Sequence, residues 1–178
     1  MSEQFVVGMA GFIRFREIMD TLPDIQDAPN AVDLDNVDGE ICFKDVSFSY
    51  DSGIEVLEKI NITIKAGEML AVVGSTGGGK TTFCHLIPRF YEVDSGSISI
   101  DGKDIKSIKQ ESLRKAVGVV QQDVFLFAGS VRDNIRYGRM NASDEEVERA
   151  ARRAEIHDEI IKMPNGYDTW VGERGILL

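Results

Sequence analysis

The sequence predicts an α/β fold in which a buried strand leads into a glycine-rich loop and the loop leads into a helix. Residues 69–73 form a continuous apolar run, which is typical of a strand that is covered on both faces. Glycines dominate residues 74–79, and residues 81–87 read as a helix that is closed by Pro88. The order strand, loop, helix is the core unit of many α/β proteins.

Further strand signals lie on both sides of this unit. Residues 40–50 carry strand-forming side chains with an expected kink near residues 44–45. Residues 60–64 alternate strictly, and residues 96–100 form a short strand that turns at Asp101-Gly102. The apolar residues 117–120 predict one more buried strand.

Helix signals mark the two ends of the chain. Apolar residues in segment 12–19 have helical spacing, and Pro23 ends this segment. Ser143 and Glu146 form a capping-box pattern that opens a helix reaching about residue 154. Residues 22–38 are rich in Pro, Asn and Asp and read as a solvated linker. We therefore expect three parts, residues 1–21, 22–38 and 39–178.

Composition excludes several classes of protein. The 30 acidic and 20 basic residues give a formal net charge of −10, which is the wrong sign for binding nucleic-acid phosphates. Cys42 and Cys84 have neither the number nor the spacing of a disulfide framework or a zinc site. No apolar run approaches the ~20 residues that a membrane-spanning helix needs.

The glycine-rich stretch matches the phosphate-binding pattern G-x-x-x-x-G-K-[ST] at Gly74, Gly79, Lys80 and Thr81. Glycines permit positive φ angles, so several backbone N–H groups can point at phosphate oxygens. Lys80 supplies a mobile positive charge, and the Thr81 hydroxyl is a suitable oxygen ligand for Mg²⁺. The alternative is a chance glycine turn that carries a lysine. The predicted nucleotide-binding residues of the loop are Gly74, Ser75, Thr76, Gly77, Gly78, Gly79, Lys80, Thr81 and Thr82.

Several segments around the loop resemble the ATP-binding domain of ATP-binding cassette (ABC) transporters of the exporter type. They comprise residues 46–50 (VSFSY), 96–102 (GSISIDG), 119–127 (VVQQDVFLF), 129–135 (GSVRDNI) and 171–175 (VGERG). The resemblance runs from about residue 38 to the last residue. It implies a P-loop NTPase with a RecA-like core and an antiparallel β-subdomain, incomplete at its C-terminal end.

The resemblance also implies roles for individual residues. Tyr50 matches the aromatic residue that stacks on adenine, although a packing role on a strand is the alternative. Gln122 matches the glutamine that reaches Mg²⁺ and the attacking water, with a one-residue ambiguity because Gln121 precedes it. A polar loop after a strand is the alternative for Gln122. Asp101 and Asp104 are tempting metal ligands, but their spacing equally fits a solvated hairpin turn.

The end of the resemblance sets further expectations. The chain stops before the family's signature sequence, the aspartate and glutamate that serve Mg²⁺ and water, and the switch histidine. We therefore expect residues 1–178 alone to bind ATP weakly and to hydrolyse it poorly. The resemblance of residues 8–20 to the end of a membrane helix implies a transmembrane domain in the same transporter.

The implied partners are that transmembrane domain and a second nucleotide-binding domain in a head-to-tail dimer, at the cytoplasmic face of a membrane. ATP and Mg²⁺ are the implied cofactors, and residues 169–175 are implied to touch the membrane domain. Two other classes stay open, a P-loop kinase and a nucleotide-binding module without catalysis. The transported substrate cannot be read from these residues.

Overall fold

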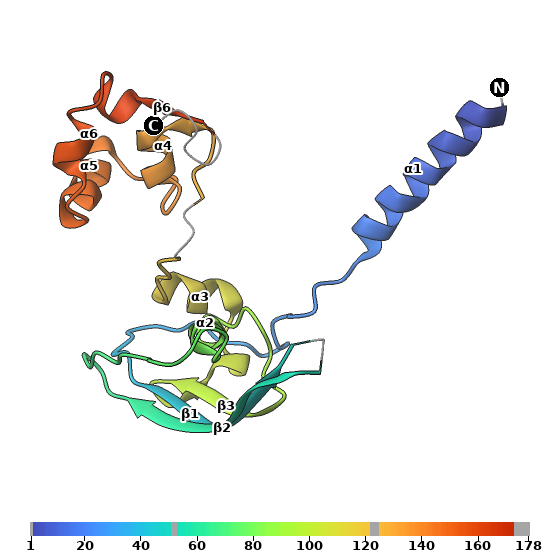
Figure 1. The fold of residues 1–178 in the computed structure, drawn as a ribbon, viewed down its shortest axis with the longest axis vertical. Helices are drawn as coiled ribbons and strands as arrows, with labels where there is room; N and C mark the ends of the chain where they lie inside the picture. Colours follow the sequence, from blue (N-terminus) through green and yellow to red (C-terminus); the bar gives the residue numbers. More distant parts are fainter. Residues whose placement is uncertain (1, 51–52, 122–124, 173–178) are drawn as a thin grey trace. The chain divides into compact units, whose positions relative to one another are not determined.

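A computed structural model describes residues 2–50, 53–121 and 125–172 (Figure 1). The chain divides into two compact units, Met1–Gly118 and Val119–Leu178, and each unit is described by itself. In the described part of the chain, no helix combines the length and the apolar content that a membrane span requires.

The first unit is built on a four-stranded antiparallel sheet with the order β2-β1-β3-β4. Its strands are β1 (Ile41–Ser49), β2 (Glu55–Ile64), β3 (Ser95–Ile100) and the short β4 (Lys103–Asp104). The predictions for residues 40–50, 60–64 and 96–100 are therefore confirmed, and β2 begins earlier than the alternating pattern indicated. The expected turn at Asp101-Gly102 joins β3 to β4.

The expected kink in β1 lies at Asp45, where the pairing of β1 with both neighbours shifts register. Asp45 has a positive φ of 49°, which is uncommon for a residue other than glycine. Gly96 of β3 fits against this bulge with φ 80°. A Cβ atom on Gly96 would lie 2.3 Å from the Asp45 carbonyl oxygen. A side chain at position 96 is therefore incompatible with the bulge as it stands.

Two helices, α2 (Lys80–Leu86) and α3 (Gln110–Ala116), lie over the same face of the sheet (Figure 1). The Phe83 ring of α2 stacks on Phe43 of β1 with a centroid distance of 4.4 Å. Leu86 and Leu113 are completely buried in the same cluster. The sheet contributes further buried apolar side chains, which are Phe43, Val46, Phe48, Leu57, Ile98 and Ile100. This core fixes α2, and with it the end of the glycine-rich loop, against β1 and β2.

Two predicted strands are wrong in this structure. Residues 69–73 and 117–120 adopt no strand, and Met69 and Val120 are 96% and 98% exposed. A strand that is apolar on both faces needs hydrogen-bonded neighbours and covering layers, because its own residues satisfy none of its backbone groups. Among the described residues no strand pairs with either segment. The apolar pattern alone therefore does not produce a strand here.

The helix predicted near the N-terminus is α1 (Ser2–Asp20), which begins earlier than its apolar spacing indicated. The irregular segment that follows it packs against the core of the first unit, to which it belongs. Leu34 is buried in the core, and its N–H donates to Ser112 Oγ over 2.8 Å. Lys109 Nζ bonds the Asp33 carboxylate over 2.7 Å, and this ion pair raises the pKa of Lys109. Part of the predicted linker, residues 22–38, therefore packs on the core of the first unit.

The second unit is mainly helical. It contains α4 (Val131–Arg136), α5 (Asp144–Arg153) and α6 (His157–Ile160), with a two-stranded pair of β5 (Gly129–Ser130) and β6 (Trp170–Val171). The predicted capping box at Ser143 and Glu146 is confirmed at the start of α5. A small core of Val147, Ala151, Ile160 and Tyr167 holds the helices together. His157 Nδ1 and the Tyr167 hydroxyl are hydrogen bonded over 2.8 Å, so His157 has a packing role.

We expect Gly96→Ala to unfold the first unit or to destabilise it strongly, because the new methyl group would meet the backbone of Asp45 at 2.3 Å. Gly102→Ala is the matched control. Gly102 also has a positive φ, of 75°, but no atom lies within 4 Å of a Cβ built there. This control should lose only about 1–2 kcal/mol. Urea unfolding of both variants checks the prediction, and equal losses would contradict this description of the bulge.

Candidate nucleotide-binding site

The glycine-rich loop of residues 74–79 lies on the surface of the first unit and ends at α2. Gly77 and Gly79 have φ angles of 80° and 78°, in the region that glycine adopts without strain. A Cβ atom on Gly79 would lie 2.9 Å from Leu57 Cδ2 of β2. The backbone angle at position 79 therefore favours glycine, and a larger residue would also displace the Leu57 side chain and crowd the Val56 carbonyl oxygen at 3.1 Å.

Lys80 holds its ammonium group over the loop from which it emerges. Its Nζ atom donates to the carbonyl oxygens of Gly74 and Ser75 at 3.0 and 2.7 Å. A lysine ammonium has three N–H donors, so one donor is left for a further acceptor. The backbone of the loop is exposed between residues 74 and 78, so an anion can reach the same place.

The two threonines after Lys80 have different surroundings. Thr81 is exposed and next to Lys80, as a ligand for a metal ion would need to be. Thr82 is buried, and its hydroxyl is hydrogen bonded to the Tyr50 hydroxyl over 2.9 Å. The structure therefore separates an outward hydroxyl on Thr81 from an inward hydroxyl on Thr82.

Tyr50 lies beside the first turn of α2, although Tyr50 and Thr82 are far apart in the sequence. Its ring makes edge contacts with Phe48 at 4.9 Å and with Tyr91 at 5.3 Å, and it is 37% exposed. These aromatic residues border a hollow of about 440 Å³. Sequence reasoning missed Tyr91, because only the tertiary packing of the segment after α2 brings its ring to Tyr50.

The other predicted metal ligand, Gln122, lies outside the described residues. Asp101 and Asp104 have structural roles. The Asp101 carboxylate accepts the backbone N–H groups of residues 38–40, and Asp104 accepts the Lys106 N–H at 2.8 Å. The hairpin-turn alternative therefore accounts for both carboxylates.

The second unit carries an apolar groove beside the segment that was predicted to touch a membrane domain. Val171 of that segment is buried and lines a groove of about 540 Å³. Aromatic side chains form much of the groove, namely Phe125, Phe127 and Tyr137. The Asn134 side chain fixes this wall, because its amide accepts the Phe127 N–H and donates to the Phe127 carbonyl oxygen.

A phosphate-loop motif that lies between strands β2 and β3 of an antiparallel sheet and ends at a helix is typical of a nucleotide-binding domain of the P-loop NTPase class. Comparison with known families gives the finer assignment. A sequence model described as "ABC transporter" matches residues 57–170, which is more than half of the chain. The chain belongs to the ABC transporter family.

Individual relatives agree with this family. A Bacillus subtilis protein named as the uncharacterized ABC transporter ATP-binding protein YwjA is 49% identical over 176 residues, which cover 99% of this chain and 31% of that protein. An ATP-dependent lipid A-core flippase from Syntrophus aciditrophicus is 48% identical over 171 residues, covering 96% of this chain and 28% of the flippase. The chain thus spans about a third of the length of these relatives.

A solved structure shows the same fold. The structure of a bacterial Atm1-family ABC exporter with ATP bound matches with a TM-score of 0.87 and 43% sequence identity. The match covers 99% of this chain and 30% of the exporter chain. The chain therefore has the nucleotide-binding fold of ABC transporters, with a P-loop and an antiparallel sheet.

Proposed function

We propose that this chain is the ATP-binding part of an exporter that couples ATP binding and hydrolysis to the movement of a substrate across a membrane. The single observation that carries the proposal is the loop around Lys80. There an ammonium group with a free donor lies over an exposed backbone whose glycines adopt positive φ angles. The triphosphate would occupy this loop, with residues 74–82 around it.

Mg²⁺ would be held by the Thr81 hydroxyl and by the carbonyl oxygen of Gln122. The exposed position of Thr81 next to Lys80 suits a hard oxygen ligand. The metal ion would neutralise phosphate charge, as in other P-loop enzymes. Gln122 would also orient the attacking water, because a neutral amide can do so without adding a charge.

Tyr50 would stack its ring on adenine. Its position supports this role. The rings of Phe48 and Tyr91 pack against the Tyr50 ring, and its hydroxyl is hydrogen bonded to Thr82 in the first turn of α2. The base and the phosphates would then bind to connected parts of one unit. Stacking on an aromatic face does not by itself select adenine over guanine.

The transmembrane domain of the same transporter and a second nucleotide-binding domain, arranged head to tail, are the partners we propose. The apolar groove next to Val171 supports the first of them, because exposed apolar surface of this kind is typical of interaction sites. The relatives that are named as exporter and flippase support the same arrangement. These partners would place the chain at the cytoplasmic face of a membrane.

The 178 residues alone would bind ATP but hydrolyse it slowly. Catalysis of phosphoryl transfer depends on charge stabilisation and on a positioned water molecule. Of the groups that would supply them, residues 1–178 contain Lys80, Thr81 and Gln122, but not the aspartate and glutamate that the family resemblance implies for Mg²⁺ and water. A nucleotide-binding module without catalysis is therefore the second candidate for residues 1–178 by themselves.

Lys80→Ala should weaken the binding of MgATP and MgGTP alike, because both triphosphates would lose a charge-assisted hydrogen bond. The expected loss is about 1.5–3 kcal/mol, or about ten- to a hundredfold in Kd. Titration calorimetry measures it. Lys103→Ala, which removes an exposed lysine of the same unit, is the control and should leave both affinities unchanged. Unchanged MgATP affinity in Lys80→Ala would show that the loop has been assigned wrongly.

Tyr50→Ala, measured in the same titrations, tests whether Tyr50 contacts the base and not the phosphates. This variant should weaken ATP and GTP to a similar degree, since either purine can stack on the ring. Its affinity for inorganic triphosphate should stay near that of the unaltered chain. If the affinity for inorganic triphosphate fell by the same factor, Tyr50 would support the structure of the loop and would not contact the base.

A phosphate-release assay tests the slow hydrolysis proposed for residues 1–178. We expect saturating MgATP to give a rate at least about a hundredfold below that of a complete nucleotide-binding domain of the family, because an incomplete constellation loses most of the transition-state stabilisation. The complete domain, measured under the same conditions, is the reference. Comparable turnover by the two proteins would disprove the proposal.

A further inference from the structure

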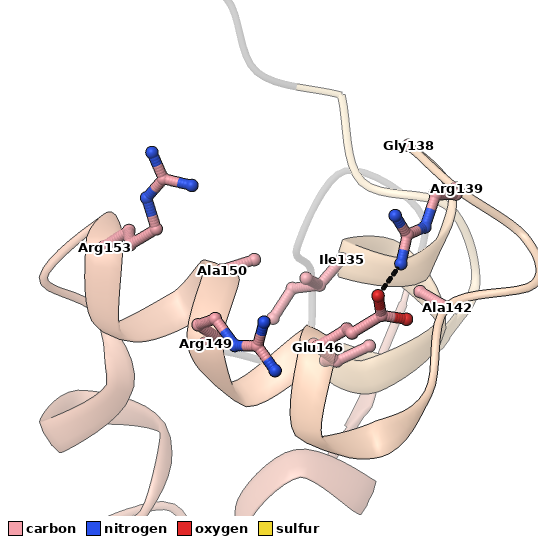
Figure 2. A pocket seen from close by; sticks show the side chains of 9 residues that line it. Ile135, Gly138, Arg139, Ala142, Glu146, Arg149, Ala150 and Arg153 are labelled. Atoms are coloured by element: carbon pink, nitrogen blue, oxygen red, sulfur yellow. Dashed lines mark ion pairs between the residues drawn. The ribbon is translucent and has the colours of Figure 1, made fainter.

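A hollow rimmed by arginines lies on the second unit, between α5 and the turn that follows α4 (Figure 2). Its volume is about 360 Å³, within the range of small-molecule sites. Arg139 comes from the turn, and Arg149 and Arg153 come from successive turns of α5. The floor is apolar and is made by small or branched side chains, which are Ile135, Ala142, Val147 and Ala150.

The carboxylates near this hollow are already engaged with other groups. Asp144 pairs with Arg132 and Arg136 on the side of α4. Glu148 pairs with Arg152, and the Glu145 carboxylate accepts the Ser143 hydroxyl. Within the described ranges, no ion pair is formed by Arg149 or by Arg153. The guanidinium groups of Arg149 and Arg153 therefore form no ion pair among these residues, although the charge of Arg149 contributes to the lowered pKa of Glu146.

Glu146 is the one acidic residue among those that line the hollow, and its carboxylate already interacts with neighbouring residues. It forms an ion pair with Arg139 (Figure 2) and accepts the Ser143 N–H at 2.9 Å as part of the capping box. The Arg139 hydrogen bond is the main cause that lowers the pKa of Glu146, so this carboxylate stays ionised at neutral pH. Three arginines and one glutamate leave the hollow with a net charge of about +2.

This local excess of positive charge is unusual for the chain, whose net charge is −10. Arg149 and Arg153 are also four residues apart on α5, a spacing at which like charges repel each other. A bound anion would remove this repulsion. Guanidinium groups suit phosphate and carboxylate ligands, because their planar forks donate two hydrogen bonds to a pair of oxygens.

We propose that this hollow binds a phosphate monoester, whose phosphate would draw together the flexible side chains of Arg149, Arg153 and Arg139, which point in different directions in Figure 2, while the esterified body lies on the apolar floor. A phosphate monoester carries a charge of about −1.5 to −2 at pH 7, which matches the net charge of the hollow. A single carboxylate would compensate only half of it. Every residue that forms this site belongs to the second unit, whereas the glycine-rich loop belongs to the first.

Binding of phenyl phosphate to the full chain tests the site. Lys80→Ala serves as the background, so that the nucleotide loop contributes little. In an NMR titration we expect the amide signals of Ile135, Ala142 and Ala150 to shift with phenyl phosphate and to stay in place with phenol. Arg149→Gln combined with Arg153→Gln should weaken binding at least about tenfold, because two charge-assisted contacts are lost. Arg152→Gln, on the same helix but outside the hollow, should change the affinity less than twofold.

Circular dichroism and thermal midpoints equal to those of Arg152→Gln would show that the double variant is folded. If it is not folded, Arg149→Lys keeps the charge without the fork and should give an intermediate affinity. Vesicles of phosphatidylcholine with phosphatidic acid test whether the bound phosphate belongs to a lipid headgroup or to a soluble ester. Binding to them that depends on Arg149 and Arg153 indicates a lipid headgroup, and binding of phenyl phosphate alone indicates a soluble ester. Absence of binding to both probes, or equal binding by the double variant, would overturn the proposal.

Discussion

The close approach of Gly79 to β2 is the contact on which the nucleotide site depends. Gly79 has a φ of 78°, and a Cβ atom there would lie 2.9 Å from Leu57 Cδ2 and 3.1 Å from the Val56 carbonyl oxygen, so another residue would strain the loop and displace these neighbours. The same glycine ends the loop and precedes α2, whose Phe83 stacks on Phe43 of β1. The position of Lys80 is therefore set by packing between α2 and the β-subdomain. The buried core thus determines the conformation of the exposed loop.

Elements whose signals are local could be predicted from the sequence. Alternating strands such as residues 60–64 and the capping box at Ser143 contain most of the information that forms them. The segments 69–73 and 117–120 could not be predicted in the same way. Their apolar runs indicate that a buried strand is compatible with the sequence, but the strand itself requires hydrogen-bonded neighbours, and no described strand pairs with them.

The candidate site, too, could be predicted from the sequence only in part. The spacing from Gly74 to Thr81 predicted the phosphate loop, because the motif is local and its chemistry is tied to residue type. The hydrogen bond between Tyr50 and Thr82 and the contact of Tyr91 with Tyr50 are tertiary, so no spacing in the sequence indicated them. The same holds for the arginine hollow, since Arg139 lines the same hollow as Arg149 and Arg153 only when α5 packs beside α4. Local patterns thus predict the chemistry of the site, and tertiary packing decides which side chains surround it.

The central claim is that the backbone of the glycine loop and Lys80 together hold the phosphates of a nucleotide. Amide chemical shifts test it most directly, because they report on individual N–H groups. With MgATP and with inorganic triphosphate, the largest shifts should fall on Gly77, Gly79, Lys80 and Thr81, whereas adenosine should leave these signals in place. If adenosine alone shifted the same four amides, or if triphosphate shifted none of them, the loop would not be the phosphate site.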